Sequence, residues 1–207
     1  MFEAIIFDLD YTLYDESKFL EKVVNDTNII KKKIKIDYKF RLLSKNIIID
    51  ILKKNNSYNK KNSLIIFNDL KKNKVKLKLY KGFLPLLKKL KKDKIKVGIL
   101  TNGNPLIQKN KIKNLKIKKY FNSIVFSKNL GKEKPHKKSF LTIMKKIKSN
   151  PKKSLFVGDH KDNDIVGAKS IGMKTLWVNH LKSNYNKSDF MVYNPSGTSK
   201  KILKLIR

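Results

Sequence analysis

From Gly82 onward, short apolar runs alternate with amphipathic segments, and no other feature of the sequence constrains the fold as strongly. The apolar runs predict strands at 95–100, 124–126, 155–157 and 175–178. The segments between them predict helices at 83–92, after 104–105, around 140–147 and at 164–171. Strands separated by helices imply right-handed crossovers and a mostly parallel sheet. Ala4-Ile5-Ile6-Phe7 adds a buried strand at the start, so the sequence predicts a doubly wound α/β domain.

Residues 15–80 interrupt this alternation. Apolar residues recur there at helical spacing in two groups, one from Phe19 to Ile30 and one from Leu42 to Leu52, and residues 64–70 suggest a third helix. Val75, Leu77 and Leu79 alternate with lysines, which favours an extended segment. We therefore predict a helical insertion at 15–80, within a core formed by residues 1–14 and 81–207.

Length and composition agree with a globular chain in a reducing compartment. The 207 residues are 40% hydrophobic, which suffices for a buried core with a modest insertion. No apolar run reaches the roughly 18 residues of a membrane span, and the N-terminus lacks a basic region and a cleavage pattern. Cysteine is absent, which excludes disulfides and thiolate metal sites. We expect a cytoplasmic protein that does not bind membranes.

The net charge of +34 suggests nucleic acid as a partner if it is taken alone. However, Arg41 and Arg207 are the only arginines, and base reading favours arginine over lysine. The lysines are spread along the chain, and lysine, asparagine and isoleucine are enriched together, as A/T-rich codons would produce. We interpret the charge as genome composition and expect no specific nucleic-acid site.

Polar clusters follow the predicted strands at the points where they end. They are Asp8 to Thr12, Thr101-Asn102-Gly103, Lys134-Pro135, and Gly158-Asp159 with Asn163-Asp164. Open parallel sheets bind ligands beyond the carboxyl ends of their strands, so these clusters should meet at one edge. Gly103 and Gly158 lie inside clusters, in a chain with only 8 glycines, which indicates left-handed backbone or close approach there.

Taken in order, these clusters resemble the motifs of the haloacid dehalogenase superfamily. Phe7 to Leu13 is similar to the nucleophile motif, 101–103 to the second, 134–135 to the third and 158–168 to the fourth. The resemblance implies a Rossmann-like core, and it identifies the insertion after the first strand with the family's small helical cap.

The resemblance also implies a Mg²⁺ cofactor. Its ligands would be Asp8, the backbone carbonyl of Asp10, and Asp159, with Asp164 orienting the metal site. Such an ion is needed because a phosphate monoester is polyanionic and repels an attacking carboxylate.

The same resemblance assigns the chemical steps. Asp8 would attack phosphorus and form an aspartyl-phosphate, and Asp10 would serve as general acid and base. Thr101, Asn102 and nearby backbone N–H groups would hold the phosphoryl oxygens, and Lys134 would supply fixed positive charge. These roles predict a phosphatase acting on a small phosphorylated metabolite.

Other polar and aromatic residues receive structural interpretations. Asp15 and Glu16 are expected to cap and begin a helix, and Asp162 to cap the helix that follows it. His160 is expected to face solvent, and His136 and His180 have no partner at metal-binding spacing. Phe7, Phe156 and Trp177 are typical of core positions. Phe19, Tyr38, Phe40 and Phe67 are interpreted as packing within the cap.

Alternatives remain open at this point. A phosphomutase shares the catalytic set, whereas a dehalogenase has no alkoxide to protonate, so Asp10 favours phosphoryl transfer. A different class of function is also possible, that of a basic nucleic-acid-binding protein on a hydrolase fold. The presence of every catalytic residue weighs against this hypothesis. The substrate and the oligomeric state are left undetermined by the sequence.

Overall fold

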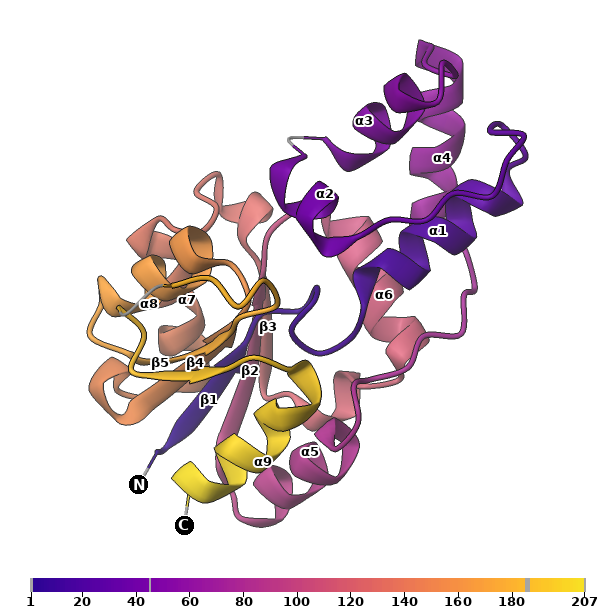
Figure 1. Ribbon diagram of the computed structural model, residues 1–207. Helices are drawn as coiled ribbons and strands as arrows, with labels where there is room; N and C mark the ends of the chain where they lie inside the picture. Colours follow the sequence, from indigo (N-terminus) through magenta and orange to yellow (C-terminus); the bar gives the residue numbers. More distant parts are fainter. Residues whose placement is uncertain (1, 45, 185–186, 207) are drawn as a thin grey trace.

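A six-stranded parallel sheet forms the centre of the computed structural model, which describes residues 2–44, 46–184 and 187–206 (Figure 1). The strand order is β3-β2-β1-β4-β5-β6, and every neighbouring pair is parallel. The strands are β1 (Ala4–Phe7), β2 (Lys96–Thr101), β3 (Ser123–Phe126), β4 (Ser154–Gly158), β5 (Lys174–Val178) and β6 (Phe190–Val192). The predicted doubly wound α/β fold is confirmed.

The central strand β1 is buried on both faces, because side chains alternate along a strand and helices cover each side of the sheet. Ile5 and Phe7 belong to one apolar cluster, and Ala4 and Ile6 to another. The first cluster includes residues of α5 (Phe83–Lys92), α6 (Pro105–Leu115) and α9 (Pro195–Leu205). The second includes residues of α7 (Lys137–Ile147) and α8 (Gly167–Lys169).

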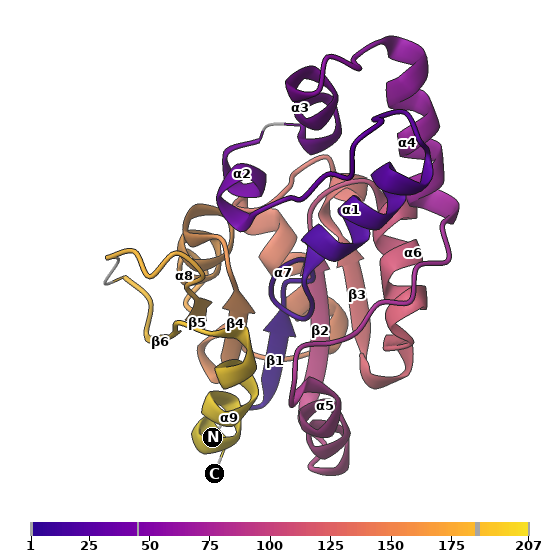
Figure 2. The same ribbon diagram turned by 45° about the vertical axis from the view of Figure 1, so that its right-hand side comes forward.

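Four helices of residues 15–80, which we call the cap segment, lie beyond the carboxyl ends of the strands (Figure 2). They are α1 (Glu16–Asp26), α2 (Tyr38–Leu43), α3 (Ile47–Lys54) and α4 (Lys60–Lys72). Helix α1 begins where the Asp15 side chain accepts a hydrogen bond from the Ser17 backbone N–H, as expected. The division into a core of 1–14 and 81–207 and a cap of 15–80 stays a proposal.

Helix α4 joins the cap segment to the rest of the molecule. It packs against α1 and α3 within the cap and against α6 of the core. The Asn110 side chain donates to the carbonyl oxygens of Leu70 and Asn73 at 3.0 and 2.9 Å. The Asn114 side chain donates to Asn73 at 2.9 Å. The C-terminal end of α4 is therefore fixed to α6.

The structure departs from the sequence predictions inside the cap segment. The expected extended segment at 75–79 forms a single bridge, between Leu79 and Tyr14, because it has no neighbouring strand to pair with. The expected helix from Leu42 to Leu52 is divided into α2 and α3. Asn46 begins the second of these by accepting a hydrogen bond from the Ile49 backbone N–H.

Further departures lie in the C-terminal part of the chain. Strand β6 and helix α9 were not predicted. The expected helix at 164–171 is a π-helical turn over Lys161–Val166 followed by the short α8. Short 3₁₀ turns cover Lys118–Tyr120, Ser127–Leu130 and Pro151–Lys153. Among the described residues, no helix combines the length and apolar character that crossing a membrane requires.

Candidate active site

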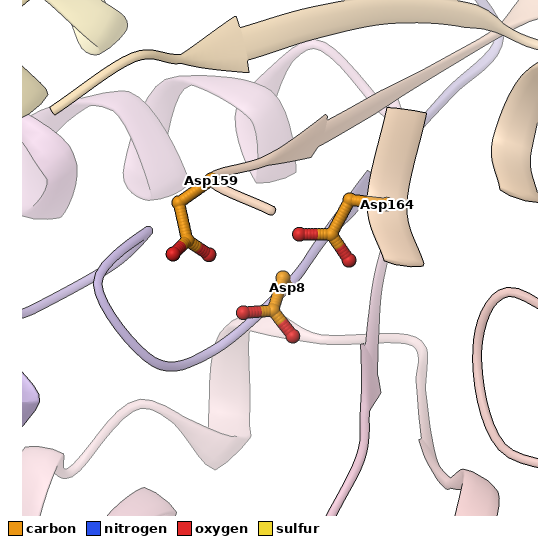
Figure 3. A group of neighbouring side chains, drawn as sticks. All are labelled: Asp8, Asp159 and Asp164. Carbon is orange, nitrogen blue, oxygen red and sulfur yellow. The ribbon is translucent and has the colours of Figure 1, made fainter. Parts of the chain in front are cut away.

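Three carboxylates meet at the carboxyl ends of β1 and β4. Asp8 directly follows β1, Asp159 directly follows β4, and Asp164 lies in the π-helical turn after it. Because β1 and β4 are neighbours in parallel register, the residues after them are brought side by side. One carboxylate oxygen from each lies within 4.8 Å of the others, and Figure 3 shows the three groups converging. The sequence prediction had brought these three residues to one site.

Lys134 is the cation of this cluster. Its Nζ lies 2.5 Å from Asp8 Oδ1 and 2.7 Å from Asp164 Oδ1, and the lysine is only 6% exposed. Asn102 holds the Lys134 backbone from both sides, accepting from its N–H at 2.9 Å and donating to its carbonyl at 3.0 Å. Ser127 donates to the same Asn102 oxygen at 2.6 Å. The Asn102 side chain therefore positions Lys134, and phosphate binding by Asn102 is left to its backbone N–H as a proposal.

Charge in this cluster is out of balance, since three carboxylates face one ammonium group. Burial raises the pKa of Asp8 to about 7, with Asp164 adding to the rise and Lys134 opposing it. Burial and the neighbouring Asp164 and Asp8 raise the pKa of Asp159 well above its ordinary value. Buried carboxylate oxygens with unbalanced negative charge are the ligands that a hard divalent cation prefers. The residues present therefore fit a Mg²⁺ ion.

Asp10 lies beside this cluster but its carboxylate faces other partners. Tyr14 hydroxyl donates to Oδ1 at 2.6 Å, and Lys111 Nζ lies 2.9 Å from the same oxygen. Gln108 donates to Oδ2 at 2.8 Å and also to the Thr101 hydroxyl at 2.7 Å. Gln108 thus links the predicted acid/base to the predicted phosphate-binding threonine at the end of β2. Metal ligation by the Asp10 carbonyl stays a prediction.

A second buried charge cluster joins the cap segment to α6. Glu16 of α1 accepts from Lys111 Nζ at 2.5 Å and from Arg41 Nε of α2 at 2.8 Å. Burial of Glu16 opposes its charge, but Lys111 and Arg41 outweigh that effect and lower its pKa to about 2. Sequence analysis gave Glu16 a first-turn role and did not single out Lys111 or Gln108. Arg41 could have been singled out from the sequence, because it is one of only two arginines.

Both clusters line one cavity between the cap segment and the strand ends. It has a volume of about 320 Å³. The core contributes the predicted site residues to its lining. The cap segment contributes the side chains of Leu20, Leu42, Ile48 and Phe67 together with Arg41. The expectation that Phe67 serves only cap packing is therefore wrong in part, because this ring also lines the cavity. A small molecule held here would contact polar groups at one end and apolar groups at the other.

Gly158 shows how closely the groups of the site approach one another. A Cβ atom at this position would lie 2.4 Å from Asp164 Oδ2, a distance that no real contact tolerates. Residue 158 therefore has to be glycine, because the Asp164 side chain occupies the space that a Cβ atom would need. Gly103 has a φ of 91°, in the left-handed region that favours glycine. Both sequence interpretations of these glycines are confirmed.

The loop after Asp159 corrects two interpretations. His160, and not Asp162, begins the helical turn, because His160 Nδ1 accepts from the Asn163 backbone N–H at 3.2 Å, whereas Asp162 is exposed. His160 does not simply face solvent: it is half-buried and lines the cavity. The His160 backbone N–H donates to Asp164 Oδ2 at 3.0 Å. The loop therefore holds this carboxylate in place.

Tyr38 of α2 also departs from its interpretation as cap packing. Its hydroxyl donates to Asp159 Oδ2 at 2.9 Å, so a cap side chain contacts one of the three clustered carboxylates. His180, two residues after the end of β5, stacks on the Tyr38 ring. Tyr38 and Asp159 are 121 residues apart in the sequence, which explains why no local pattern revealed their hydrogen bond.

The profile of the haloacid dehalogenase-like hydrolases matches residues 5–178 of this chain. The match runs from β1 through the cap segment to the end of β5. The chain belongs to this family. Its membership agrees with the order of the polar clusters along the sequence and with their meeting at one edge of the sheet.

Relatives of this chain include proteins named as phosphatases. The glyceraldehyde 3-phosphate phosphatase of Methanocaldococcus jannaschii is 30% identical over 209 residues, which cover 89% of this chain and 87% of that enzyme. The enzyme of the same name from Pyrococcus furiosus is 37% identical over 71 residues, and this match spans only 34% of the chain and 30% of the relative.

Solved structures of the family share the fold. A putative haloacid dehalogenase-type hydrolase from Bacillus subtilis, crystallised with magnesium bound, superposes with a TM-score of 0.76. The superposition covers 100% of this chain and 99% of that one, at 18% sequence identity. At this identity the likeness concerns the arrangement of strands, helices and cap.

Proposed function

We propose that this protein is a Mg²⁺-dependent phosphatase that hydrolyses a small phosphate monoester through an aspartyl-phosphate on Asp8. The observation that carries the proposal is the buried cluster of Asp8, Asp159 and Asp164 around Lys134. Such an excess of buried carboxylates is costly unless a cation balances it. A phosphate ester needs the same balance, because its own negative charge opposes attack by a carboxylate.

Asp8 is placed for the first step. An oxygen of its carboxylate forms a bond to phosphorus while the bond from phosphorus to the alcohol oxygen breaks, which leaves an acyl phosphate on Asp8. Lys134 holds Asp8 Oδ1, so the carboxylate keeps one orientation and the phosphoryl oxygens meet a fixed positive charge. A bound Mg²⁺ would supply further charge neutralisation between the carboxylates and the phosphoryl group.

In the proposed mechanism, Asp10 transfers a proton in both steps. In its acid form it gives a proton to the departing alcohol oxygen, and in its base form it takes one from the water that cleaves the acyl phosphate. Lys111, Gln108 and Tyr14 fix the direction of this carboxylate. The release of an alkoxide requires such an acid, so the presence of Asp10 favours a phosphatase over a dehalogenase.

The cavity supports a short leaving group with polar oxygens. Its volume of about 320 Å³ is shared between the phosphate and the rest of the substrate. The side chain of Arg41 is 34% exposed, so it keeps N–H groups for a substrate oxygen beyond its bond to Glu16. The long match to the glyceraldehyde 3-phosphate phosphatase of Methanocaldococcus jannaschii supports a triose phosphate as substrate.

Phosphate release from a panel of metabolites tests the proposal. The panel contains triose phosphates, phosphoglycolate and nucleoside monophosphates, each with Mg²⁺, with excess chelator, and with Mg²⁺ restored. We expect release from a triose phosphate that stops in chelator and returns with the metal. Equal rates with and without chelator would refute the metal requirement, and no release from any ester would refute the activity.

Action in the cytoplasm remains a prediction from the cysteine-free sequence.

A further inference from the structure

Tyr38 contacts the metal cluster from the cap side. It is the first residue of α2, and its hydroxyl lies 2.9 Å from Asp159 Oδ2 and 3.3 Å from the Asp159 carbonyl oxygen. Asp159 belongs to the core, at the carboxyl end of β4. This hydrogen bond therefore joins the cap segment to a residue that the proposed function uses to bind the cation.

The Tyr38 ring is held in place by core residues. It stacks on His180 with ring centroids 4.4 Å apart and an interplanar angle of 27°. Tyr11 meets it edge-on at 4.9 Å and 77°. His180 Nε2 in turn lies 2.7 Å from the Tyr11 carbonyl oxygen. Because three rings fix one another, the hydroxyl is directed at Asp159 without freedom to turn away.

Asp159 is held from opposite sides by the cap and the core. Its Oδ1 accepts from the Thr12 hydroxyl at 3.3 Å, and its carbonyl oxygen accepts from Trp177 Nε1 at 2.7 Å. Tyr38 adds the contact at Oδ2. Each carboxylate oxygen keeps a lone pair for a cation, since an ionised carboxylate accepts about four hydrogen bonds.

Tyr38 also forms a wall of the site. Together with Asp159 it lines the cavity of about 320 Å³ on one side and a second hollow under His180 and Leu181 on the other. The ring is therefore part of the boundary between the two hollows. Excluding water there strengthens every electrostatic interaction inside the cavity.

We propose that Tyr38, which belongs to the cap segment, is a positioning residue of the metal site. The inference rests on the proposed cation at Asp8, Asp159 and Asp164. Partners of metal ligands orient them, and losing such a partner weakens metal binding about 10- to 100-fold.

The test measures cation binding without any substrate. The purified full chain is titrated with Mn²⁺, a paramagnetic substitute for Mg²⁺, and free Mn²⁺ is followed by electron paramagnetic resonance. Tyr38→Phe removes the hydroxyl and keeps the ring on His180. We expect its Mn²⁺ dissociation constant to rise about tenfold, and that of Tyr38→Ala to rise further because the wall is lost as well.

Tyr58→Phe is the matched control, since it removes the same atom from an exposed tyrosine of the cap. Its Mn²⁺ affinity should equal that of the wild type. A merely structural role for Tyr38 would lower the unfolding temperature without metal and leave the affinity alone. Wild-type affinity in Tyr38→Phe therefore overturns this inference.

The Asp159→Asn variant distinguishes a failure of this inference from a failure of the proposed function. It should abolish Mn²⁺ binding. Wild-type binding by Asp159→Asn, or absence of binding by the wild-type protein, would instead refute the metal site of the proposed function and this inference with it. Loss in Asp159→Asn combined with no change in Tyr38→Phe refutes only the role of Tyr38.

Discussion

Two buried charge clusters lie side by side in the cavity, and they differ in balance. The cluster around Lys134 has three carboxylates and one ammonium group. The cluster around Glu16 has two carboxylates, Glu16 and Asp10, and two cations, Lys111 and Arg41. In the first cluster burial raises the pKa of Asp8 despite Lys134, whereas in the second Lys111 and Arg41 outweigh burial and lower the pKa of Glu16.

This difference separates a site that needs a ligand from one that does not. The balanced cluster satisfies its own charges, so it can hold the cap segment and direct Asp10 without any other group. The unbalanced cluster keeps an excess of negative charge that protein groups do not cancel. The proposed cation site thus differs from the balanced cluster in the sign of its residual charge more than in its number of acidic residues.

Asp8→Asn should have the largest effect of any single change. The amide keeps the shape of the side chain but is neither a nucleophile nor an anionic metal ligand. We expect phosphate release to fall below detection, while circular dichroism and the unfolding temperature show a folded protein. Turnover near the wild-type rate would mean that the unbalanced cluster does not contain the nucleophile.

Lys134→Ala should reduce kcat by about 100-fold, as the loss of one fixed electrostatic stabiliser does elsewhere. Replacement of the exposed Lys146 of α7 by alanine provides the control, since this side chain faces solvent in the same part of the core. Steady-state phosphate release measures both. Similar rates for the two variants would show that Lys134 has no special role despite its burial.

Lys111→Met tests the balanced cluster. It leaves buried Glu16 with Arg41 alone, so we expect a loss of about 3–5 kcal/mol in unfolding free energy and a smaller effect on rate than Lys134→Ala. The double variant Glu16→Gln with Lys111→Met should recover part of this stability in urea unfolding. If the single and double variants are equally stable, the two charges are not coupled.

The same cluster predicts a pH dependence of stability. The folded pKa of Glu16, about 2, lies below the ordinary value near 4.3. Its contribution is therefore complete above about pH 4.3 and is lost as pH falls toward 2. The stability difference between the wild type and Glu16→Gln should accordingly shrink between pH 5 and pH 3, about the range over which the unfolded-state carboxyl takes up its proton.

The diffuse charge of +34 should have the smallest effect. Lysine is a flexible point donor, so unrelated duplexes and single strands should bind weakly and equally at low salt. This binding should disappear at about 0.15 M salt, where screening is strong. Sequence-selective binding that survives such salt, measured by fluorescence anisotropy, would restore nucleic acid as a partner.

Sequence patterns predicted the parallel core because each central strand is a short run buried on both faces. Helix 83–92 was placed to the residue, since Gly82 and the apolar spacing of Phe83, Leu86, Leu87 and Leu90 mark it locally. Strand β6 escaped prediction because Phe190–Val192 is a three-residue edge strand with half-buried side chains. Helix α9 has few apolar residues between lysines, and its one local signal is Pro195 after Asn194.

Site residues on strand ends could be predicted, whereas those brought by packing could not. Asp8, Lys134 and Asp159 come from short motifs whose position after a strand already places them. Lys111 lies 95 residues from Glu16 in sequence, and nothing local distinguishes it among 50 basic residues. What distinguishes Lys111 is that only 2% of its surface is exposed, and burial is a property of the assembled fold.

The attachment of α4 to α6 has a mechanical consequence for access to the cavity. Asn110 and Asn114 tie one end of the cap segment to the core through carbonyl groups, whereas α2 reaches the core through the Tyr38 hydroxyl and ring. A rotation that spares these amide hydrogen bonds would have its axis along the α4–α6 contact and would move α2 relative to the core. Hydrogen exchange faster in 38–43 than in 66–72 would support that axis, and the reverse order would exclude it.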